Sequence, residues 1–307
     1  MRIAAVQFAP SFLDTAATLE QMLAAMSEAA NAGASLVAFP ETALSGYPGW
    51  LSPTGGAAFD DSAQKHAYAH YVDAAVEADG PEVARLAEAA RDLDLHLVTG
   101  LIERGSARGR GSTWAGLLQV SRRVAPSIHR KLVPTFEERL VWSAGDANEL
   151  RTHPLGRDFR VGALNCWENW MPLARAALYE QGEDVHVSVW PGSPELTRDI
   201  SRFTAREGRV LVVAASGVLQ ARDIPDSFPL KAAWLEAAEG DFIHSGGTRI
   251  VSPTGADLVA LDEPVEGIAY ADLDPAVLRS ERQNFDPAGH YSRPDLLRLE
   301  VVRGTPR

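Results

Sequence analysis

Three residues of types that can carry covalent chemistry stand where predicted strands stop: Glu41, Lys131 and Cys166. Cys166 is the only cysteine of the chain, so it is the only thiol that could act as a nucleophile. A glutamate beside a thiol can take its proton as a general base, and a lysine ammonium can stabilise the negative charge of a tetrahedral intermediate. The three types together suit nucleophilic attack on an electrophilic carbon.

Each of these residues, taken alone, also has an ordinary structural explanation. A single cysteine is often a small buried apolar residue, and isolated glutamates and lysines are mostly solvated surface charges. Their position favours chemistry, because loops at the C-terminal ends of strands in an α/β sheet form ligand sites. Convergence of the three side chains is therefore a hypothesis that the structure can test.

The elements that must position these residues alternate between strand-like and helix-like segments, which is typical of an α/β layer protein. We expect a strand over residues 2–8 and a helix over residues 15–31, where apolar side chains recur at i, i+3, i+4 and i+7. Strands over 35–39, 124–130 and 159–164 lead to Glu41, Lys131 and Cys166, whereas 217–244 shows no regular period. Because no linker separates two halves, we expect a single domain over residues 1–307, with a short C-terminal tail from about residue 286.

Composition excludes several classes of protein. Lys plus Arg number 29 against 41 Asp plus Glu, and the net charge of −12 argues against nucleic-acid or anionic-membrane partners. One cysteine forbids an intrachain disulfide and indicates a reducing compartment. The chain begins with a strand-like segment and has no run of about 18 apolar residues, so neither a signal peptide nor a membrane span is predicted. We expect a cytoplasmic protein.

The sequence offers little for a metal ion. His66 and His70 lie four residues apart on a predicted helix and could face a metal together. The glutamate of a His-Glu-x-x-His site is absent, however, and no third ligand is evident, so a surface pair is favoured. We therefore expect neither a metal nor a cofactor.

Longer runs around the three reactive residues carry a resemblance to a known family. The relevant runs are Phe39-Pro40-Glu41-Thr42 with Gly46-Tyr47-Pro48, His129-Arg130-Lys131-Leu132-Val133-Pro134-Thr135 with Glu138, Leu164-Asn165-Cys166-Trp167-Glu168-Asn169-Trp170, and Gly289-His290-Tyr291-Ser292-Arg293-Pro294-Asp295. In this order they resemble the glutamate, lysine, cysteine and C-terminal motifs of the nitrilase superfamily, specifically of its nitrilase branch, with flanks similar to those of arylacetonitrilases and aliphatic nitrilases. The resemblance covers nearly the whole chain.

The resemblance implies an α/β fold, a four-layer αββα sandwich of two mixed sheets with helices outside. It also implies that Glu41, Lys131 and Cys166 form the catalytic triad and that Glu138 is the family's additional glutamate near the lysine. The implied activity is hydrolysis of an organic nitrile to the carboxylic acid and ammonia, through a covalent thioimidate and thioester on Cys166.

Two other functions remain open. An amidase or carbamoylase of the same superfamily would use the same triad, although the residues that follow Cys166 favour a nitrilase. A catalytically inactive scaffold or binding protein could keep the fold, but retention of Glu41, Lys131, Glu138 and Cys166 argues against this alternative.

Aromatic residues at motif positions suggest an apolar substrate pocket. These residues are Tyr47, Trp142, Trp167, Trp170 and Trp190, and the backbone N–H of Trp167 is a candidate oxyanion donor. Trp142 and Trp190 are equally well explained as ordinary core residues. Phe136 departs from the family pattern, which commonly has histidine there, so substrate range is left open. The tail after the C-terminal motif is short, and we therefore expect a homodimer or a short homo-oligomer as the assembly.

Overall fold

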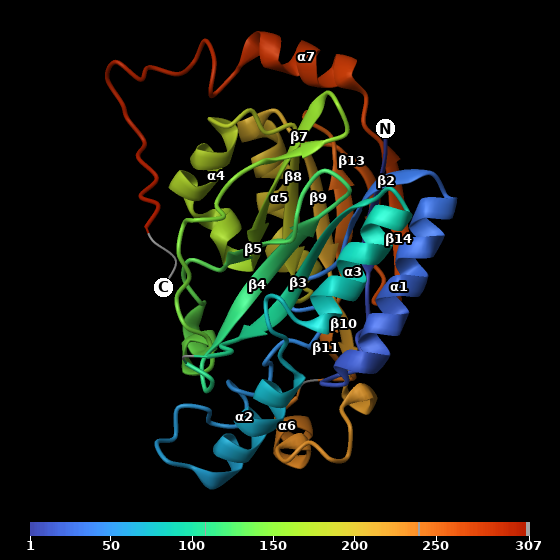
Figure 1. The fold of residues 1–307 in the computed structure, drawn as a ribbon, viewed down its shortest axis with the longest axis vertical. Helices are drawn as coiled ribbons and strands as arrows, with labels where there is room; N and C mark the ends of the chain where they lie inside the picture. The colour runs from blue at the N-terminus through green and yellow to red at the C-terminus, as the bar shows by residue number, and fades with distance from the viewer. Residues whose placement is uncertain (108, 239, 305–307) are drawn as a thin grey trace.

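Two six-stranded mixed sheets form the centre of the computed structural model, which describes residues 1–107, 109–238 and 240–304 (Figure 1). The first sheet has the order β14-β1-β2-β3-β4-β5. Its strands are β1 (Arg2–Gln7), β2 (Ala34–Ala38), β3 (His96–Arg104), β4 (Thr113–Val120), β5 (Ser127–Arg130) and β14 (Gly267–Asp272). The second sheet has the order β13-β12-β9-β8-β7-β6. Its strands are β6 (His153–Leu155), β7 (Phe159–Asn165), β8 (Val185–Trp190), β9 (Leu211–Ser216), β12 (Thr248–Val251) and β13 (Asp257–Leu261).

The two sheets pack face to face through alternate side chains of their central strands. Val185, Val187 and Val189 of β8 are fully buried and belong to one apolar cluster with Ile3 and Ala5 of β1. Every second residue of a strand points to the same face, so this alternation places one face of each sheet in the shared core. Burial of apolar side chains from both inner faces stabilises the sandwich.

Helices cover the outer face of each sheet, which completes the four layers that were expected. α1 (Thr15–Asn31) and α3 (Pro81–Asp92) pack on the first sheet, and the bounds predicted for α1 are confirmed. α4 (Pro172–Tyr179) and α5 (Pro194–Gly208) cover the second sheet (Figure 1). Asp14 accepts a hydrogen bond from the N–H of Ala17 at the start of α1, while α3, α4 and α5 each begin with proline, as is common at a first helical turn.

The region 217–244, expected to be irregular, contains regular elements instead. β10 (Val218–Gln220) and β11 (Phe242–Ser245) form an antiparallel pair, and α6 (Lys231–Ala237) lies between them in the chain. α6 lies near α2 (Ser62–Ala74) at one end of the molecule, where Trp50, Phe228 and Trp234 pack in an aromatic cluster (Figure 1). The prediction was wrong because these short elements are stabilised by distant aromatic contacts, which leave no local period in the sequence.

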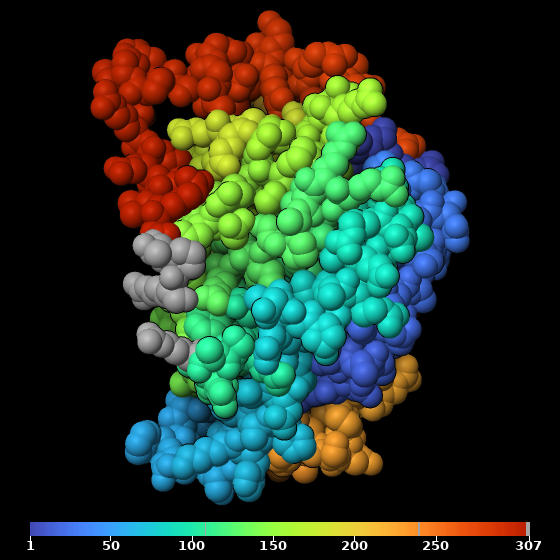
Figure 2. Space-filling view, in the orientation of Figure 1, coloured from blue at the N-terminus to red at the C-terminus, as the bar shows by residue number. Residues whose placement is uncertain are grey.

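The two ends of the chain are tied to the sandwich. β14 pairs antiparallel with β1 from Arg2 opposite Asp272 to Gln7 opposite Gly267. After α7 (Pro275–Asn284) the tail crosses the α4 side of the molecule, where Leu299 and Val301 pack on the α4 cluster (Figures 1 and 2). The last residues of the predicted domain, 305–307, lie outside the described residues. Within the described residues, no helix is long and apolar enough to cross a bilayer.

Candidate active site

Four buried side chains from both sheets meet at one end of the sandwich. Lys131 Nζ donates to Glu41 Oε1 at 2.9 Å and to Glu138 Oε2 at 2.7 Å. One carboxylate oxygen of Glu41, one of Glu138 and Sγ of Cys166 all lie within 4.8 Å of one another. None of the four residues is more than 3% exposed. The structure thus brings together the three residues that follow predicted strands, and Glu138 with them.

Close backbone packing positions the loops that carry Glu41 and Lys131. Glu41 follows β2, and a Cβ built on Gly100 of β3 would lie only 2.1 Å from the backbone nitrogen of Thr42. Lys131 follows β5, and its carbonyl accepts a hydrogen bond from the N–H of Gly145 at 2.8 Å. A Cβ on Gly145 would lie 2.2 Å from the carbonyl oxygen of Arg130. Glycine at 100 and 145 therefore lets the backbone pack closely against the segments that carry Glu41 and Lys131, and this packing positions both side chains.

Cys166 lies in a strained turn at the end of β7. It begins a 3-10 turn, η2 (Cys166–Trp170), and has a left-handed backbone with φ of 47°. For a residue with a Cβ this conformation costs about 1 to 3 kcal/mol, so neighbouring contacts must maintain it. One such contact is the Nδ2 of Asn169, which donates to the carbonyl oxygen of Cys166 at 2.8 Å. The turn lifts the thiol out of the strand toward Glu41 and Lys131.

Burial and neighbouring charges set the protonation of the site. Burial raises the pKa of Glu41 from 4.5 to about 7, although Lys131 acts in the opposite direction. Burial would lower the pKa of Lys131, but the charges of Glu41, Cys166 and Glu138 outweigh it and raise the pKa above its usual value. Burial, reinforced by Glu41, raises the pKa of the Cys166 thiol well above its usual value. The resting site therefore holds a neutral thiol, a cationic ammonium and a carboxyl that can exchange a proton near neutrality.

Glu138 accepts hydrogen bonds from Tyr47, Thr135 and Lys131. Its Oε1 accepts from the Tyr47 hydroxyl at 2.7 Å, and its Oε2 accepts from the N–H of Thr135 at 2.6 Å in addition to Lys131. Thr135 begins the 3-10 turn η1 (Phe136–Leu140), so Glu138 both caps this turn and orients the ammonium. Burial and Glu138 together raise the pKa of Tyr47 well above its usual value, which keeps the hydroxyl a donor.

The aromatic residues expected around a substrate fall into two groups. Trp142 is buried, contacts the Lys131 ammonium at 5.3 Å from its ring and the Tyr47 ring at 5.7 Å, and donates through Nε1 to the Tyr71 hydroxyl. Trp190 is buried and packs against Cys166. The side chains of Trp167 and Trp170 are 45% and 43% exposed and stack on each other at 5.7 Å. Tyr47, Trp142 and Trp190 are thus the aromatic residues that surround the buried groups.

Glu168, which was not predicted as a site residue, joins the ends of the two strands that lead to Lys131 and Cys166. Its carboxylate accepts from the N–H of Leu132 at 2.6 Å, from the N–H of Asn165 at 2.9 Å and from His129 Nε2 at 3.1 Å. Burial would raise the pKa of Glu168, but His129 and the two backbone donors outweigh it and lower the pKa. The sequence contained a hint of this role. A carboxylate beside a buried strand must accept hydrogen bonds from several donors, and the lysine motif contains a possible donor, His129.

Polar and apolar residues alternate in β8, and this pattern could have pointed to buried polar residues behind the site. His186 and Ser188 both lie on one face of this buried strand and both bind Oδ1 of Asn169, each at 2.8 Å. Buried polar side chains at alternate positions of a strand require partners on the neighbouring layer. Their partner is the residue that holds the carbonyl of Cys166.

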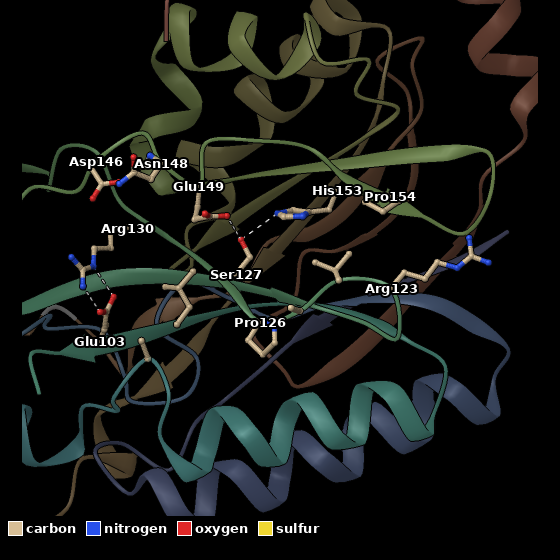
Figure 3. A pocket seen from close by; sticks show the side chains of 14 residues that line it. Glu103, Arg123, Pro126, Ser127, Arg130, Asp146, Asn148, Glu149, His153 and Pro154 are labelled. Atoms are coloured by element: carbon tan, nitrogen blue, oxygen red, sulfur yellow. Dashed lines mark hydrogen bonds and ion pairs between the residues drawn. The ribbon is translucent and has the colours of Figure 1, made fainter. Parts of the chain in front are cut away.

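Figure 3 shows a separate surface groove of about 610 Å³, whose lining includes none of Glu41, Lys131, Glu138 and Cys166. In it Ser127 donates to Glu149 Oε2 at 2.6 Å and lies 3.4 Å from His153 Nε2, while Arg130 pairs with Glu103. Because the Ser127 proton is given to a carboxylate, His153 is not placed to activate the hydroxyl. The contacts of Ser127 in this groove therefore give no sign of an activated hydroxyl.

Metal binding can be judged from the same geometry. Glu41, Glu138 and Cys166 are close enough to share an ion, but the Lys131 ammonium already occupies the position between the two carboxylates. His66 and His70 belong to no such group of three ligands within the described ranges. The donor set therefore suits an ammonium rather than a divalent cation.

Comparison with known proteins identifies the family. The model of the carbon-nitrogen hydrolase family matches residues 2–283. The chain is 37% identical to a nitrilase from Pseudomonas syringae over 97% of this chain and 89% of the relative, and 36% identical to an aliphatic nitrilase from Rhodococcus rhodochrous over 97% and 81%. A CN-hydrolase superfamily protein from Xanthomonas campestris shares the fold, with a TM-score of 0.72 and 19% identity over 99% of both chains. The chain therefore belongs to the carbon-nitrogen hydrolase family.

Proposed function

We propose that the protein is a nitrilase, which hydrolyses an organic nitrile to the carboxylic acid and ammonia. The observation that carries this proposal is the buried Cys166 thiol within 4.8 Å of the carboxylates of Glu41 and Glu138, both hydrogen-bonded to Lys131. The relatives from Pseudomonas syringae and Rhodococcus rhodochrous, which align over nearly the whole chain, are named nitrilases.

Catalysis begins with attack of Cys166 Sγ on the nitrile carbon. Glu41 takes the thiol proton and delivers it to the nitrile nitrogen, so that a neutral thioimidate forms on the enzyme. Addition of one water and departure of ammonia leave a thioester, and a second water releases the carboxylic acid and restores the thiol. A carboxyl with a pKa of about 7 can both accept and return protons in these steps near neutral pH.

Lys131 stabilises the charge that develops on the substrate nitrogen and later on oxygen. Its ammonium is buried and fixed between Glu41 and Glu138, so little reorganisation is needed as charge appears. Loss of one such donor typically lowers kcat by about 10²- to 10³-fold. The backbone N–H of Trp167, which lies beside the thiol, is a second donor to the intermediate.

The surroundings of the thiol favour an apolar nitrile. Trp190 packs against Cys166, and the rings of Tyr47 and Trp142 lie next to Lys131. Such walls exclude water and accept an aryl or alkyl group, while the charged groups act on the C–N unit alone.

The test is turnover of phenylacetonitrile and of phenylacetamide, with ammonia and the acid both measured. Wild-type protein should release ammonia from the nitrile, and Cys166→Ser should reduce the release to background. His66→Gln, a change of an exposed residue remote from the triad in the sequence, serves as the matched control and should retain full activity. Turnover of the amide alone would contradict the proposal and favour an amidase.

The ratio of acid to amide is a second readout of the same intermediate. A relative from Lupinus angustifolius, 34% identical over 98% of this chain and 86% of its own, is named a bifunctional nitrilase/nitrile hydratase. After water adds to the thioimidate, expulsion of ammonia leads to acid and expulsion of the thiolate leads to amide. We propose that acid is the main product here, because a proton supplied by Glu41 makes nitrogen the better leaving group.

We also propose that the protein is a cytoplasmic homo-oligomer without nucleic-acid or membrane partners. Leu173 of α4 and Leu196 and Phe203 of α5 are more than half exposed, so helices on one side of the molecule present apolar side chains to solvent. The single cysteine and the net charge of −12 support the location and the absence of such partners. Light scattering after size-exclusion chromatography, and fractionation of cells that make the tagged protein, test these statements; a monomer at all concentrations would contradict the assembly.

A further inference from the structure

Behind the nucleophile, four buried polar side chains form a continuous run of hydrogen bonds that the proposed chemistry does not use. Nδ2 of Asn169 donates to the carbonyl oxygens of Cys166 at 2.8 Å and of Leu164 at 3.3 Å. Oδ1 of Asn169 accepts from Ser188 Oγ and from His186 Nε2, each at 2.8 Å. Nδ1 of His186 lies 3.0 Å from Glu183 Oε1. We call Glu183, His186, Ser188 and Asn169 the relay.

The relay is fully enclosed. Its four members are 2%, 0%, 1% and 0% exposed in the order Glu183, His186, Ser188, Asn169. A buried polar group costs free energy unless it is hydrogen-bonded, and here every polar atom of the Asn169 amide and of the His186 ring has a partner. A Cβ on Gly162 would lie 2.0 Å from Glu183 Oε1, so only glycine leaves room for this carboxyl. Burial, complete hydrogen bonding and the space left by Gly162 together show that these four side chains form one enclosed hydrogen-bond network.

The hydrogen-bond roles are fixed by chemistry. Carbonyl oxygens can only accept, so the side of Asn169 that faces Cys166 and Leu164 must be the NH₂ group. Oδ1 is then an acceptor, and His186 must carry a proton on Nε2. The contact of His186 Nδ1 with Glu183 is a hydrogen bond when one further proton lies on either atom, and burial raises the pKa of Glu183. Either placement of that proton leaves Nε2–H pointing at Asn169.

We infer that Asn169, oriented by His186 and Glu183, is the positioning residue that holds Cys166 in its left-handed conformation and aims Sγ at the substrate. The inference deepens the proposed function and rests on Cys166 being the nucleophile. Without the hydrogen bond from Asn169 to the Cys166 carbonyl, one restraint on the strained Cys166 φ of 47° is lost and the turn can relax. Displacement of a reacting atom by about 1 Å typically costs about 10²-fold in rate. Because Asn169 does not touch substrate, KM should change little.

The test compares variants that keep or remove the donor contacts. Asn169→Asp has the same shape but replaces the NH₂ donor by an acceptor. His186→Leu removes the donor to Asn169, whereas the amide of His186→Gln can still donate to the same oxygen. His96→Leu is the matched control, because His96 is also a buried histidine with an amide partner, Gln119, but lies on β3 outside the relay.

Three quantities are measured for each variant: kcat and KM for a nitrile that the wild type hydrolyses, the rate of alkylation by iodoacetamide, and Tm. Alkylation reports on Cys166 alone, because the chain has one cysteine. Asn169→Asp and His186→Leu should lower kcat by about 10²-fold and slow alkylation, with KM within about threefold. His186→Gln should keep kcat within about fivefold, and His96→Leu should lower Tm without changing kcat.

Two results would overturn the inference. One is an unchanged kcat and alkylation rate in folded Asn169→Asp and His186→Leu; the other is a His186→Gln variant as impaired as His186→Leu. If Asn169→Asp does not fold, Ser188→Ala removes one donor from the same oxygen with a smaller change and should lower kcat by up to about tenfold. A wild type that hydrolyses no nitrile would contradict the proposed function, and the alkylation rates would still test the relay.

Discussion

Replacement of Glu41 by glutamine should remove a pH dependence of stability that the wild type possesses. Burial raises the pKa of Glu41 from 4.5 to about 7 in the folded protein, whereas the unfolded chain keeps the ordinary value. The folded state therefore binds this proton more tightly than the unfolded state. Its contribution to stability is fully present below about pH 4.5 and is lost as the pH rises through about 7.

The magnitude follows from the two pKa values. A rise from 4.5 to about 7, at about 1.4 kcal/mol per pKa unit, corresponds to about 3 kcal/mol of folding free energy. Glutamine does not titrate, so the free energy of unfolding of wild type minus that of Glu41→Gln should fall by about this amount between about pH 4 and about pH 8. Because other titrating groups are shared by the two proteins, most of their contributions cancel in the difference.

Urea unfolding followed by tryptophan fluorescence across this pH range measures the difference. Glu137→Gln is the matched control, since Glu137 lies in the same 3-10 turn as Glu138 but outside the triad. The decrease for Glu41→Gln is compared with the change that this control shows. A constant difference for Glu41→Gln, or one that rises with pH, would refute the assignment of a raised pKa. In the wild type, kcat/KM for the nitrile should decline below about pH 7, because protonated Glu41 cannot take the thiol proton.

Two further substitutions test the supports of the site. Trp142→Phe removes the Nε1 donor to the Tyr71 hydroxyl, and urea unfolding should show a loss of about 1 to 3 kcal/mol of stability; an unchanged value would show that the buried bond is dispensable. Gly145→Ala places a Cβ 2.2 Å from the carbonyl oxygen of Arg130, and should lower stability by at least about 1 to 3 kcal/mol and reduce kcat with it. The control is Gly111→Ala, since no described atom lies within 4 Å of its added Cβ and the change should stay within about 0.5 kcal/mol; equal behaviour of the two variants would contradict the packing argument.

Much of the layer order could be predicted from the sequence, because each layer has its own local period. α1 shows a helical period along its full length, and its bounds were predicted without error. β8 and β9 are buried runs rich in valine, as expected for strands covered on both faces. The β10–β11 pair and α6 were missed, because Phe228 and Trp234 of this region pack against Trp50, which is distant in sequence.

The sequence predicted the reactive side chains of the site but not the buried residues that hold them in place. Residue type and strand ends made Glu41, Lys131 and Cys166 candidates, and the resemblance of the runs around them to the nitrilase motifs selected them as the triad. Glu168 and Asn169 could not be chosen in this way, because their importance lies in which backbone groups they bind. Such roles depend on the pairing of strands from two sheets, and a single sequence does not show that pairing.

The pairing of β14 with β1 determines when the first sheet can be completed in the nascent chain. β1 is synthesised well before its neighbour, which spans Gly267–Asp272. The first sheet therefore remains one strand short until residues 267–272 have left the ribosome. β12 and β13, at the edge of the second sheet, are also made late. Since the triad needs both sheets, we expect Cys166 to gain its reactivity only after β12, β13 and β14 have paired with the strands made before them.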